Sequence, residues 1–540
     1  MSPRHIPVLI AGAGLAGLTA ATLLAWRGVP CLLVERRAST SRHPRARGVN
    51  LRSMELLQGV PGLTDDLCRT GASDFSDFSI VIAESVAGWE IRTLLAPGEM
   101  DISSLSPAPA CTAGQDRIEP ILLRHARALG AEIRFSTELA GFTQDAEGVS
   151  ATLRDVASGS ETHLRADYLI AADGNRSPAR QGLGIGARGH GTLSHNMSIL
   201  FEADLAPLLR GRGFVLYYLQ NPGFTGAFIS TDDPRVGQVS VEYDPARESA
   251  ADYTVARCVS MVRAALGLPE LEVKVLDVMP WEMSAQLADR MAAGRVFLAG
   301  DAVHTMPPTG GLGGQTAMQD AADLAWKLAM VLQGHAGPGL LETYEAERHP
   351  VAALTVARQT ANYVERLRPD RTELSGSGTE VDYISVATGY RYRSAAIVPD
   401  TADDLQPAED PLHPTGRPGT RLAHVPMLLG GRPVSTLDLA GRGFVLLAGP
   451  DGAGWTEAAR LASARLNVPL ASYRVGTDLI DTNGAFLART GLAPAGALLV
   501  RPDGFIAWRS HGAMPDPSAT LAGVLARILF RETQAREQAA

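Results

Sequence analysis

Apolar positions along the chain fall into two repeating patterns, one typical of strands and one of helices. Near the N-terminus, VLIA (Val8 to Ala11) and CLLVE (Cys31 to Glu35) are short apolar runs, and Leu15 to Arg27 between them has helical character. A second apolar run, Val296 to Ala299, precedes a Pro/Gly loop and then a helix whose apolar positions recur at helical spacing towards Gly334. Short strands that alternate with amphipathic helices predict an α/β fold of the Rossmann type.

The middle of the chain alternates apolar and polar residues at a period of two. This pattern occurs from Ser76 to Pro107 and again from His190 to Met283, in segments such as FVLYYL and VSVEYD. One helical stretch, Val255 to Leu266, interrupts it. Such alternation predicts an antiparallel sheet with one buried face. We therefore expect this sheet to be inserted into the α/β fold and to form a wall of the substrate site.

The C-terminal part of the chain reads as a separate unit. It contains a strand (Phe444 to Leu447), a helix (Glu457 to Leu466), a hairpin turned at Pro502-Asp503-Gly504 and a last helix (Ser518 to Arg531). This order predicts a thioredoxin-like domain. No cysteine follows Cys258, so the unit has no dithiol chemistry.

These patterns divide the chain into four predicted parts. Residues between the sheet and the C-terminal unit are rich in Gly, Pro, Asp and Thr, which favours a linker with one strand-like piece from Gly389 to Ile397. The predicted parts are a discontinuous nucleotide-binding domain (1–75, 108–190 and 284–372), a substrate-binding sheet domain (76–107 and 191–283), a linker (373–420) and a thioredoxin-like domain (421–540).

Composition and charge narrow the class of protein. The chain has 540 residues, 45% hydrophobic and 20% charged, as expected for a globular protein with ample core. Its net charge of -9, without a basic block, argues against a nucleic-acid surface. The four cysteines are widely spaced, which predicts no metal site and no disulfide framework and favours the cytoplasm. Val8 to Trp26 is uncharged and offers a membrane span as an alternative, but its three glycines disfavour it.

Those glycines form a GxGxxG motif at a strand-to-helix turn. In this motif Gly12 makes the tight turn, Gly14 admits a pyrophosphate and Gly17 lets the helix pack on the strand. Glu35, at the end of the next strand, then takes ribose hydroxyls, and we include its neighbour Arg36 in the site. The motif therefore predicts a dinucleotide site.

Further candidate residues stand at the ends of other strands and in loops. Arg45 lies in a loop just past the dinucleotide strand and Gln115 opens a helix, although a solvated loop and a simple helix cap are alternatives. Asp173 ends an apolar strand, with a surface turn as its alternative reading, and Asp301 ends another. The loop after Asp301 exposes backbone N–H groups before a helix, which suits an anionic or flat cofactor. Its candidate residues are Pro308, Gly311, Gly313 and Gly314.

Three motifs occur in one order: GAGLAG with Glu35, then YLIAADGNRS, then RVFLAGDAVHTMPPTGG. This set resembles the flavin-dependent aromatic hydroxylases of the p-hydroxybenzoate hydroxylase type. The spacing, the PRARG loop and the cysteine-free tail resemble the branch that acts on polycyclic aromatic polyketides, the aklavinone 11-hydroxylase group. The resemblance covers the chain end to end. It departs from the family at Gln315, where many relatives have Asn.

The resemblance implies a cofactor and a role for each motif. Gly12, Gly14, Gly17 and Glu35 would hold the ADP half of FAD, and Arg45 and Gln115 its ribityl-phosphate region. Asp173 would lie by the cofactor and the approach of the nicotinamide, Asp301 would bind ribityl hydroxyls, and the loop from Pro308 to Gly314 would face the isoalloxazine. NADPH or NADH would bind transiently, and O2 would form a flavin C4a-hydroperoxide that hydroxylates an electron-rich phenolic ring.

Some protein group must favour the phenolate, since deprotonation makes the ring a better nucleophile. The candidates are Tyr218 in the inserted sheet and Arg366 near the end of a long helix, with purely structural roles as the alternative. For His304 we favour a structural role, as a histidine packed beneath the loop, over the role of a general base.

The leading hypothesis is thus an enzyme, an FAD-dependent monooxygenase that hydroxylates a polycyclic aromatic polyketide of anthracycline or angucycline type. Its partners would be a small aromatic molecule and O2, without nucleic acid or membrane, and the chain would be a monomer or homodimer. One alternative keeps the fold for Baeyer-Villiger oxygenation or inactivation of an aromatic antibiotic. Another is a non-catalytic flavin- or ligand-binding accessory protein.

Overall fold

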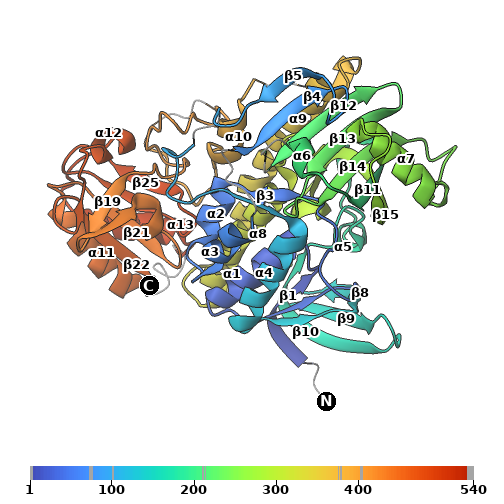
Figure 1. The fold of residues 1–540 in the computed structure, drawn as a ribbon. Coiled ribbons are helices and arrows are strands. Elements are labelled where there is room, and N and C mark those ends of the chain that lie inside the picture. Colours follow the sequence, from blue (N-terminus) through green and yellow to red (C-terminus); the bar gives the residue numbers. More distant parts are fainter. Residues whose placement is uncertain are drawn as a thin grey trace.

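A computed structural model describes residues 4–71, 77–99, 102–209, 212, 214–374, 376, 380–401 and 405–531. The chain forms a mixed α/β molecule with three regions (Figure 1). A nucleotide-binding region with a mainly parallel sheet lies in the middle. A second, large sheet lies on one side of it, and the C-terminal unit lies on the other.

The central sheet is built on β1 (Arg4–Ala11), which pairs in parallel with β2 (Cys31–Val34) and β10 (Glu161–Ala171). Strand β10 in turn pairs in parallel with β17 (Val296–Leu298). The last residues of these strands are direct neighbours, so all three sequence motifs begin at the same edge of the sheet. The sheet is completed by β7 (Glu132–Arg134), β8 (Thr137–Gln144), β9 (Val149–Asp155) and β16 (Ala292–Ala293).

Helices α1 (Leu15–Trp26), α4 (Gln115–Ala128) and α8 (Gly313–Leu332) share the core on one face of this sheet. Almost every residue of α1 is buried, because the sheet, α4 and α8 surround it. The uncharged run that offered a membrane span is therefore an internal strand and helix. Among the helices of the described residues, none combines the length and apolar character needed to cross a bilayer. Smaller elements are β3 (Arg47–Val49), α2 (Leu51–Leu57), α3 (Leu63–Thr70), β6 (Cys111–Gly114) and α5 (Pro178–Gly182).

The second sheet has the strand order β18-β15-β11-β14-β13-β12-β4-β5 and is antiparallel except where β12 meets β4. Helix α7 (Val255–Leu266) shares a core with one face of this sheet. Helix α9 (Thr343–Leu367) packs against β15 at the other face. The strands are β4 (Ser79–Ala83), β5 (Glu90–Leu95), β11 (Ala187–Glu202), β12 (Val215–Asn221), β13 (Phe224–Ser230), β14 (Val236–Tyr243), β15 (Lys274–Ala288) and β18 (His304–Thr305), with short helices α6 (Ala206–Leu209) and η2 (Ala250–Asp252).

Two strands of this sheet extend past the predicted boundaries. Strand β11 begins before residue 191 and β15 continues past residue 283, because these long strands lead directly to and from the nucleotide-binding region. Strand β18, just after Asp301, also joins this sheet through β15. The predicted boundary at 75/76 touches residues 72–76, outside the described residues.

The C-terminal unit has a four-stranded sheet of order β22-β21-β24-β25. Helices α11 (Ala453–Leu466) and α13 (Pro517–Ile528) share a core with this sheet, which Trp326 of α8 also joins. The strands are β21 (Phe444–Ala448), β22 (Leu470–Arg474), β24 (Ala497–Val500) and β25 (Ile506–Ser510). A smaller sheet contains β19 (Pro426–Leu429), β20 (Arg432–Ser435) and β23 (Leu479–Ile480), with η6 (Thr436–Leu439) and α12 (Phe486–Thr490) nearby in the chain.

The segment 373–420, predicted as a linker, is packed in its described part. It contains α10 (Tyr383–Thr388), and Tyr390 and Tyr392 are buried against Phe505 of the C-terminal unit. The predicted strand at 389–397 is reduced to a single bridge at Tyr390. The polar composition of the segment does not reveal this packing, which depends on two tyrosines that lie two residues apart. The remaining elements are three short 3-10 helices, η3 (Gly300–Ala302), η4 (Pro338–Glu342) and η5 (Thr372–Leu374).

Candidate active site

The three glycines of the N-terminal turn have three different surroundings. Gly12 has a φ of 104°, and a methyl group there would collide with the carbonyl oxygen of Ala172. A methyl group on Gly17 would collide with the carbonyl oxygen of Gly12. Beside Gly14, in contrast, a methyl group would meet no atom within 4 Å. This open space lies at the N-terminus of α1, which no side chain caps, and it fits the phosphates of a dinucleotide.

Glu35 follows β2 and points at this turn. Its carboxylate accepts hydrogen bonds from the backbone N–H of Ala13 at 2.8 Å and of Arg37 at 2.9 Å. A carboxylate has about four acceptor sites, so Glu35 retains capacity for a ligand hydroxyl. Arg36 is exposed beside it.

The loop that contains Arg45 is hydrogen-bonded to the start of α4 at Gln115. The backbone N–H of Gln115 donates to Ala46 O at 2.8 Å, and its side chain donates to Glu119 at 2.6 Å. Partial desolvation lowers the pKa of Arg45, while Glu119 and Asp301 stabilise its charge. Burial raises the pKa of Glu119. Glu119 was missed by the sequence reasoning, because a single Glu inside a helix carries no motif.

Asp301 stands at the end of β17, in η3. It is accessible to solvent but enclosed by protein on its other sides, and this desolvation raises its pKa, against the effect of His304 and Arg45. Gly300 before it has a φ of 63°, and a methyl group there would lie 3.1 Å from Ala317 Cβ and 3.2 Å from Ala16 Cβ. Such close packing of η3 on α1 and α8 keeps Asp301 near the glycine turn.

The Pro/Gly loop leads directly into α8. Pro308 and Gly311 are exposed, and Gly313 is the first residue of the helix, which no side chain caps. A methyl group on Gly314 would lie 2.9 Å from Leu15 Cδ1 and 3.6 Å from Ala46 Cβ. The loop therefore lies beside both the glycine turn and the Arg45 loop.

Gln315 has a structural role that its place in the motif does not reveal. Its side chain is buried, accepts from Asn50 N at 3.0 Å and donates to Gly48 O at 2.7 Å. The amide thus holds the backbone of residues 48–50.

Asp173 lies beside the glycine turn but directs its carboxylate to the start of the next helix, α5. It accepts from Ser177 Oγ at 2.6 Å and from Ala179 N at 3.0 Å. These bonds fix the turn into α5.

Tyr218 and Arg366, from β12 and α9, come together in the fold. The buried hydroxyl of Tyr218 lies close enough to the Arg366 guanidinium for the two groups to interact, and Arg366 also donates to the carbonyl oxygen of Thr309 in the Pro/Gly loop. Burial raises the pKa of Tyr218, and Arg366 opposes the rise. Burial also raises the pKa of Tyr383 to about 12, and Arg366 again opposes it. Tyr383 was missed, since it falls in the predicted linker.

His304 is packed beneath the loop, as expected. Its Nε2 lies 2.7 Å from Asp320, whose other oxygen accepts from Arg348 at 2.8 Å, and His304 and Asp320 are fully buried. A histidine enclosed in this way cannot reach a substrate as a base.

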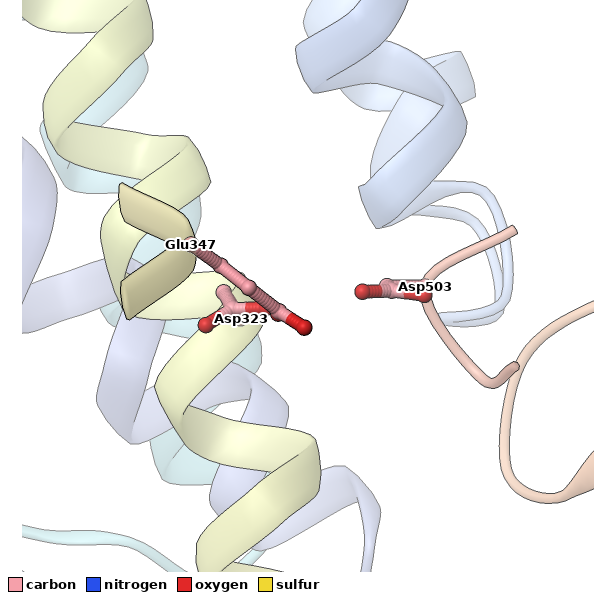
Figure 2. Close-up of side chains that lie close together, drawn as sticks. All are labelled: Asp323, Glu347 and Asp503. Atoms are coloured by element: carbon pink, nitrogen blue, oxygen red, sulfur yellow. The ribbon is translucent and has the colours of Figure 1, made fainter. Parts of the chain in front are cut away.

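One carboxylate cluster in the described part of the chain has the spacing of a metal site. Asp323 and Glu347 point towards Asp503, which comes from the C-terminal unit (Figure 2). Lys327 lies 2.7 Å from Asp323 and 2.7 Å from Glu347, and Arg501 pairs with all three carboxylates. Two cations already compensate the cluster, so we interpret it as an ion-pair network that joins α8, α9 and the C-terminal unit.

Two known protein families together match nearly the whole chain. Residues 5–359 match the FAD binding domain family, and residues 415–531 match the aromatic-ring hydroxylase C-terminal family. Aklavinone 12-hydroxylase of Streptomyces purpurascens is 46% identical over 98% of this chain and 100% of its own length. The 4-methyl-5-nitrocatechol 5-monooxygenase of a Burkholderia species is 43% identical over 98% of each chain.

Solved structures agree with these relationships. A ternary complex of aklavinone-11 hydroxylase with FAD and aklavinone superposes with a TM-score of 0.93, at 45% identity, over 98% of this chain and 100% of the other. The flavin-dependent monooxygenase PieE, in complex with FAD and substrate, has a TM-score of 0.87 at 32% identity, over 98% and 99% of the two chains. The chain therefore belongs to the family of FAD-dependent aromatic-ring hydroxylases.

Proposed function

We propose that this chain hydroxylates a polycyclic aromatic polyketide of anthracycline or angucycline type, with FAD bound and NADPH or NADH as transient reductant. The observation that carries the proposal is the contact between Tyr218 and Arg366 beside Thr309 of the Pro/Gly loop. The relatives named for aklavinone and their solved complex support the substrate class.

The residues at the sheet edge are proposed to hold FAD. The space beside Gly14, with Gly12, Gly17, Glu35 and Arg36 around it, suits the ADP half. Arg45 and Gln115 then face the ribityl phosphate, and Asp173 lies by the cofactor and the approach of the nicotinamide. Asp301 binds ribityl hydroxyls, and the loop with Pro308, Gly311, Gly313 and Gly314 borders the ring system. The uncapped N-terminus of α8 stabilises negative charge there.

Bound FAD supplies the activated oxygen, and the protein prepares the ring that receives it. Arg366 places a positive charge where a substrate phenol would ionise, which favours the phenolate. Tyr218 orients that oxygen with its hydroxyl, since burial keeps Tyr218 itself protonated. The loop and the sheet exclude water from the ring.

Further features of the chain are proposals of the same kind. We assign a thioredoxin-like fold to the C-terminal unit because β21 pairs in parallel with β22 and antiparallel with β24, which pairs antiparallel with β25. The partners are a small aromatic molecule and O2.

A second candidate substrate is a monocyclic catechol. The Burkholderia relative is named for a nitrocatechol and is 43% identical, close to the 46% of the aklavinone hydroxylase. Baeyer-Villiger oxygenation on the same fold is distinguished by its product, a lactone or ester in place of a phenol.

The test combines the FAD-loaded enzyme with aklavinone, a series of hydroxyanthraquinones and 4-methyl-5-nitrocatechol. We expect aklavinone or an anthraquinone to accelerate NADPH or NADH oxidation and to gain one 18O atom from 18O2 as a new phenol, identified by mass and NMR. Turnover of the catechol alone would favour the second candidate. If the protein binds flavin but no compound accelerates the oxidation of NADPH or NADH, the result would favour an accessory protein.

A further inference from the structure

Helix α9 carries a polar stripe in addition to Arg366. Gln359, Asn362 and Arg366 are spaced by three and four residues, which places them within about 60° on one side of the helix. Gln359 is 0% exposed and Asn362 is 1% exposed. Neither amide nitrogen nor amide oxygen of these two side chains has a hydrogen-bond partner within the described residues.

Two buried amides without partners are unfavourable in a protein interior, where nearly all polar groups are paired. Neither side chain is placed there by packing alone, because the neighbouring apolar side of α9 already makes the contacts with the sheet. That side contains Tyr363 and Val364, which share a core with Met283 and Ala285 of β15. The two amides therefore offer hydrogen-bonding capacity to a polar ligand.

The polar stripe is turned towards the reaction site. Arg366 reaches Tyr218 on β12 and Thr309 in the loop. Gln359 lies against the same loop, since a methyl group on Gly310 would be 2.7 Å from Gln359 Nε2. The backbone carbonyl oxygen of Gln359 also accepts a hydrogen bond from Thr309 Oγ1 at 2.7 Å. Asn362 lies between these two residues in the sequence and on the same side of the helix.

The sheet opposite the stripe carries small side chains beside Tyr218. Cross-strand pairing aligns Ser198, Ser240, Ala227 and Tyr218 in one row over β11, β14, β13 and β12. Their neighbours in sequence, such as Met197 and Val239, belong to the core on the α7 side, so the row faces the α9 side. Ser240 Oγ has no hydrogen-bond partner within the described residues. Small side chains at Ser198, Ser240 and Ala227 favour the placement of a flat ring over this part of the sheet.

We propose that Asn362, together with Gln359, is a substrate-specificity residue whose amide hydrogen-bonds an oxygen substituent of the aromatic substrate, a ring hydroxyl or quinone carbonyl. This inference rests on the proposed function, since it names the group that selects among polyketide rings. An amide both donates and accepts, so it matches a hydroxyl beside a carbonyl, and it rejects a ring that lacks the oxygen because the amide then stays unpaired.

The test uses the FAD-loaded enzyme and its Asn362→Leu variant, which has a similar shape without the amide. Aklavinone and isomeric monohydroxyanthraquinones are the probes, and binding is measured by the change in flavin absorbance. We expect the Kd and KM for aklavinone to rise roughly 5- to 100-fold, as for one lost buried hydrogen bond. The differences in affinity among the isomers should also become smaller.

Stability separates this role from a structural one. Because Asn362 is unpaired within the described residues, Asn362→Leu should keep or raise the Tm and should keep the flavin content. Thr360→Val is the matched control, since it removes a buried hydroxyl on the same helix that donates to Val356 O. Its Kd for aklavinone should stay within about twofold of the wild type.

If Asn362→Leu does not fold, Asn362→Ala and Asn362→Gln replace it, and the amide-bearing Gln variant should bind more tightly than the Ala variant. An unchanged Kd for every probe, or equal binding by the Ala and Gln variants, would overturn the inference while leaving the proposed function intact. Wild-type protein that binds neither aklavinone nor any hydroxyanthraquinone would overturn both.

Discussion

At the scale of single residues, the glycines of the turn after β1 differ in whether the fold or the ligand requires them. Gly12 and Gly17 are required by the backbone itself, since a side chain at either would meet a carbonyl oxygen. Gly14 faces open space, and we propose that it is required by the phosphates that bind there. The same motif thus contains two structural glycines and one that is proposed to serve the ligand.

This difference predicts opposite outcomes for two alanine substitutions. Gly17→Ala should lower the free energy of unfolding by about 3 kcal/mol, because α1 must move off β1. A larger loss would leave the variant insoluble. Gly14→Ala should keep the Tm of the apoprotein within a few degrees and raise the Kd for FAD roughly tenfold or more. Thermal unfolding and flavin fluorescence titration measure both effects. Equal FAD affinity for Gly14→Ala and wild type would place the phosphates elsewhere.

Tyr218 offers the second test at this scale. Tyr218→Phe removes the hydroxyl that contacts Arg366 and should slow hydroxylation roughly 10- to 1,000-fold, with flavin reduction by NADPH changed by less than about threefold. Stopped-flow measurement of the two half-reactions separates them. Tyr217→Phe is the matched control, because Tyr217 lies on the opposite face of β12, in the core with α7. Equal losses in both half-reactions would assign Tyr218 a structural role.

At the scale of elements, a buried ion pair fastens the Arg45 loop to the second sheet. Arg47 donates to Asp232 at 2.8 Å, with side chains that are 3% and 5% exposed, and Asp232 also accepts from Gly114 N at 2.8 Å. Arg47 also donates to Thr112 O at 3.0 Å. These contacts connect β3, β6 and the end of β13, so they keep the loop beside the substrate sheet.

Asp232→Ala should therefore destabilise the enzyme by about 3–5 kcal/mol, because it leaves the Arg47 charge buried without its partner. The change is measured by urea unfolding. Asp233→Ala, at the adjacent position with an exposed partner, Arg235, is the control and should cost less than about 1 kcal/mol. Similar costs for the two variants would show that water reaches Arg47.

At the scale of the whole molecule, the Asp323–Lys327–Glu347–Arg501–Asp503 network joins the nucleotide-binding region to the C-terminal unit (Figure 2). Burial alone would raise the pKa of Glu347, but Arg501 and Lys327 outweigh it and lower the pKa below its ordinary value. The pKa of Asp323 is raised, mainly by burial. Its contribution to the pH dependence of stability therefore has the opposite sign.

The sign for Glu347 follows from its lowered pKa. Its contribution is fully present above the ordinary glutamate pKa of about 4.3 and is lost as pH falls through the lower folded value. Glu347→Gln should cost about 3–5 kcal/mol at pH 7, and the difference from wild type should shrink below pH 4. Unfolding by urea across this pH range measures it. Glu457→Gln, in an exposed pair with Arg460, should change stability by less than about 1 kcal/mol. A difference that does not depend on pH would remove Glu347 from the network.

The sequence by itself determined the local elements and the cofactor class. The glycine motif, the strands before Asp173 and Asp301 and the helix α7 follow from period and spacing, because local backbone preferences set them. Charge pairing and long-range packing carry no such period. Only the tertiary structure decided that Tyr218 meets Arg366, that residues around Tyr390 are packed, and that Gln315 holds a backbone. The tertiary structure also decided which buried amides lack a hydrogen-bond partner within the described residues, since the partners of an amide depend on all of its neighbours at once.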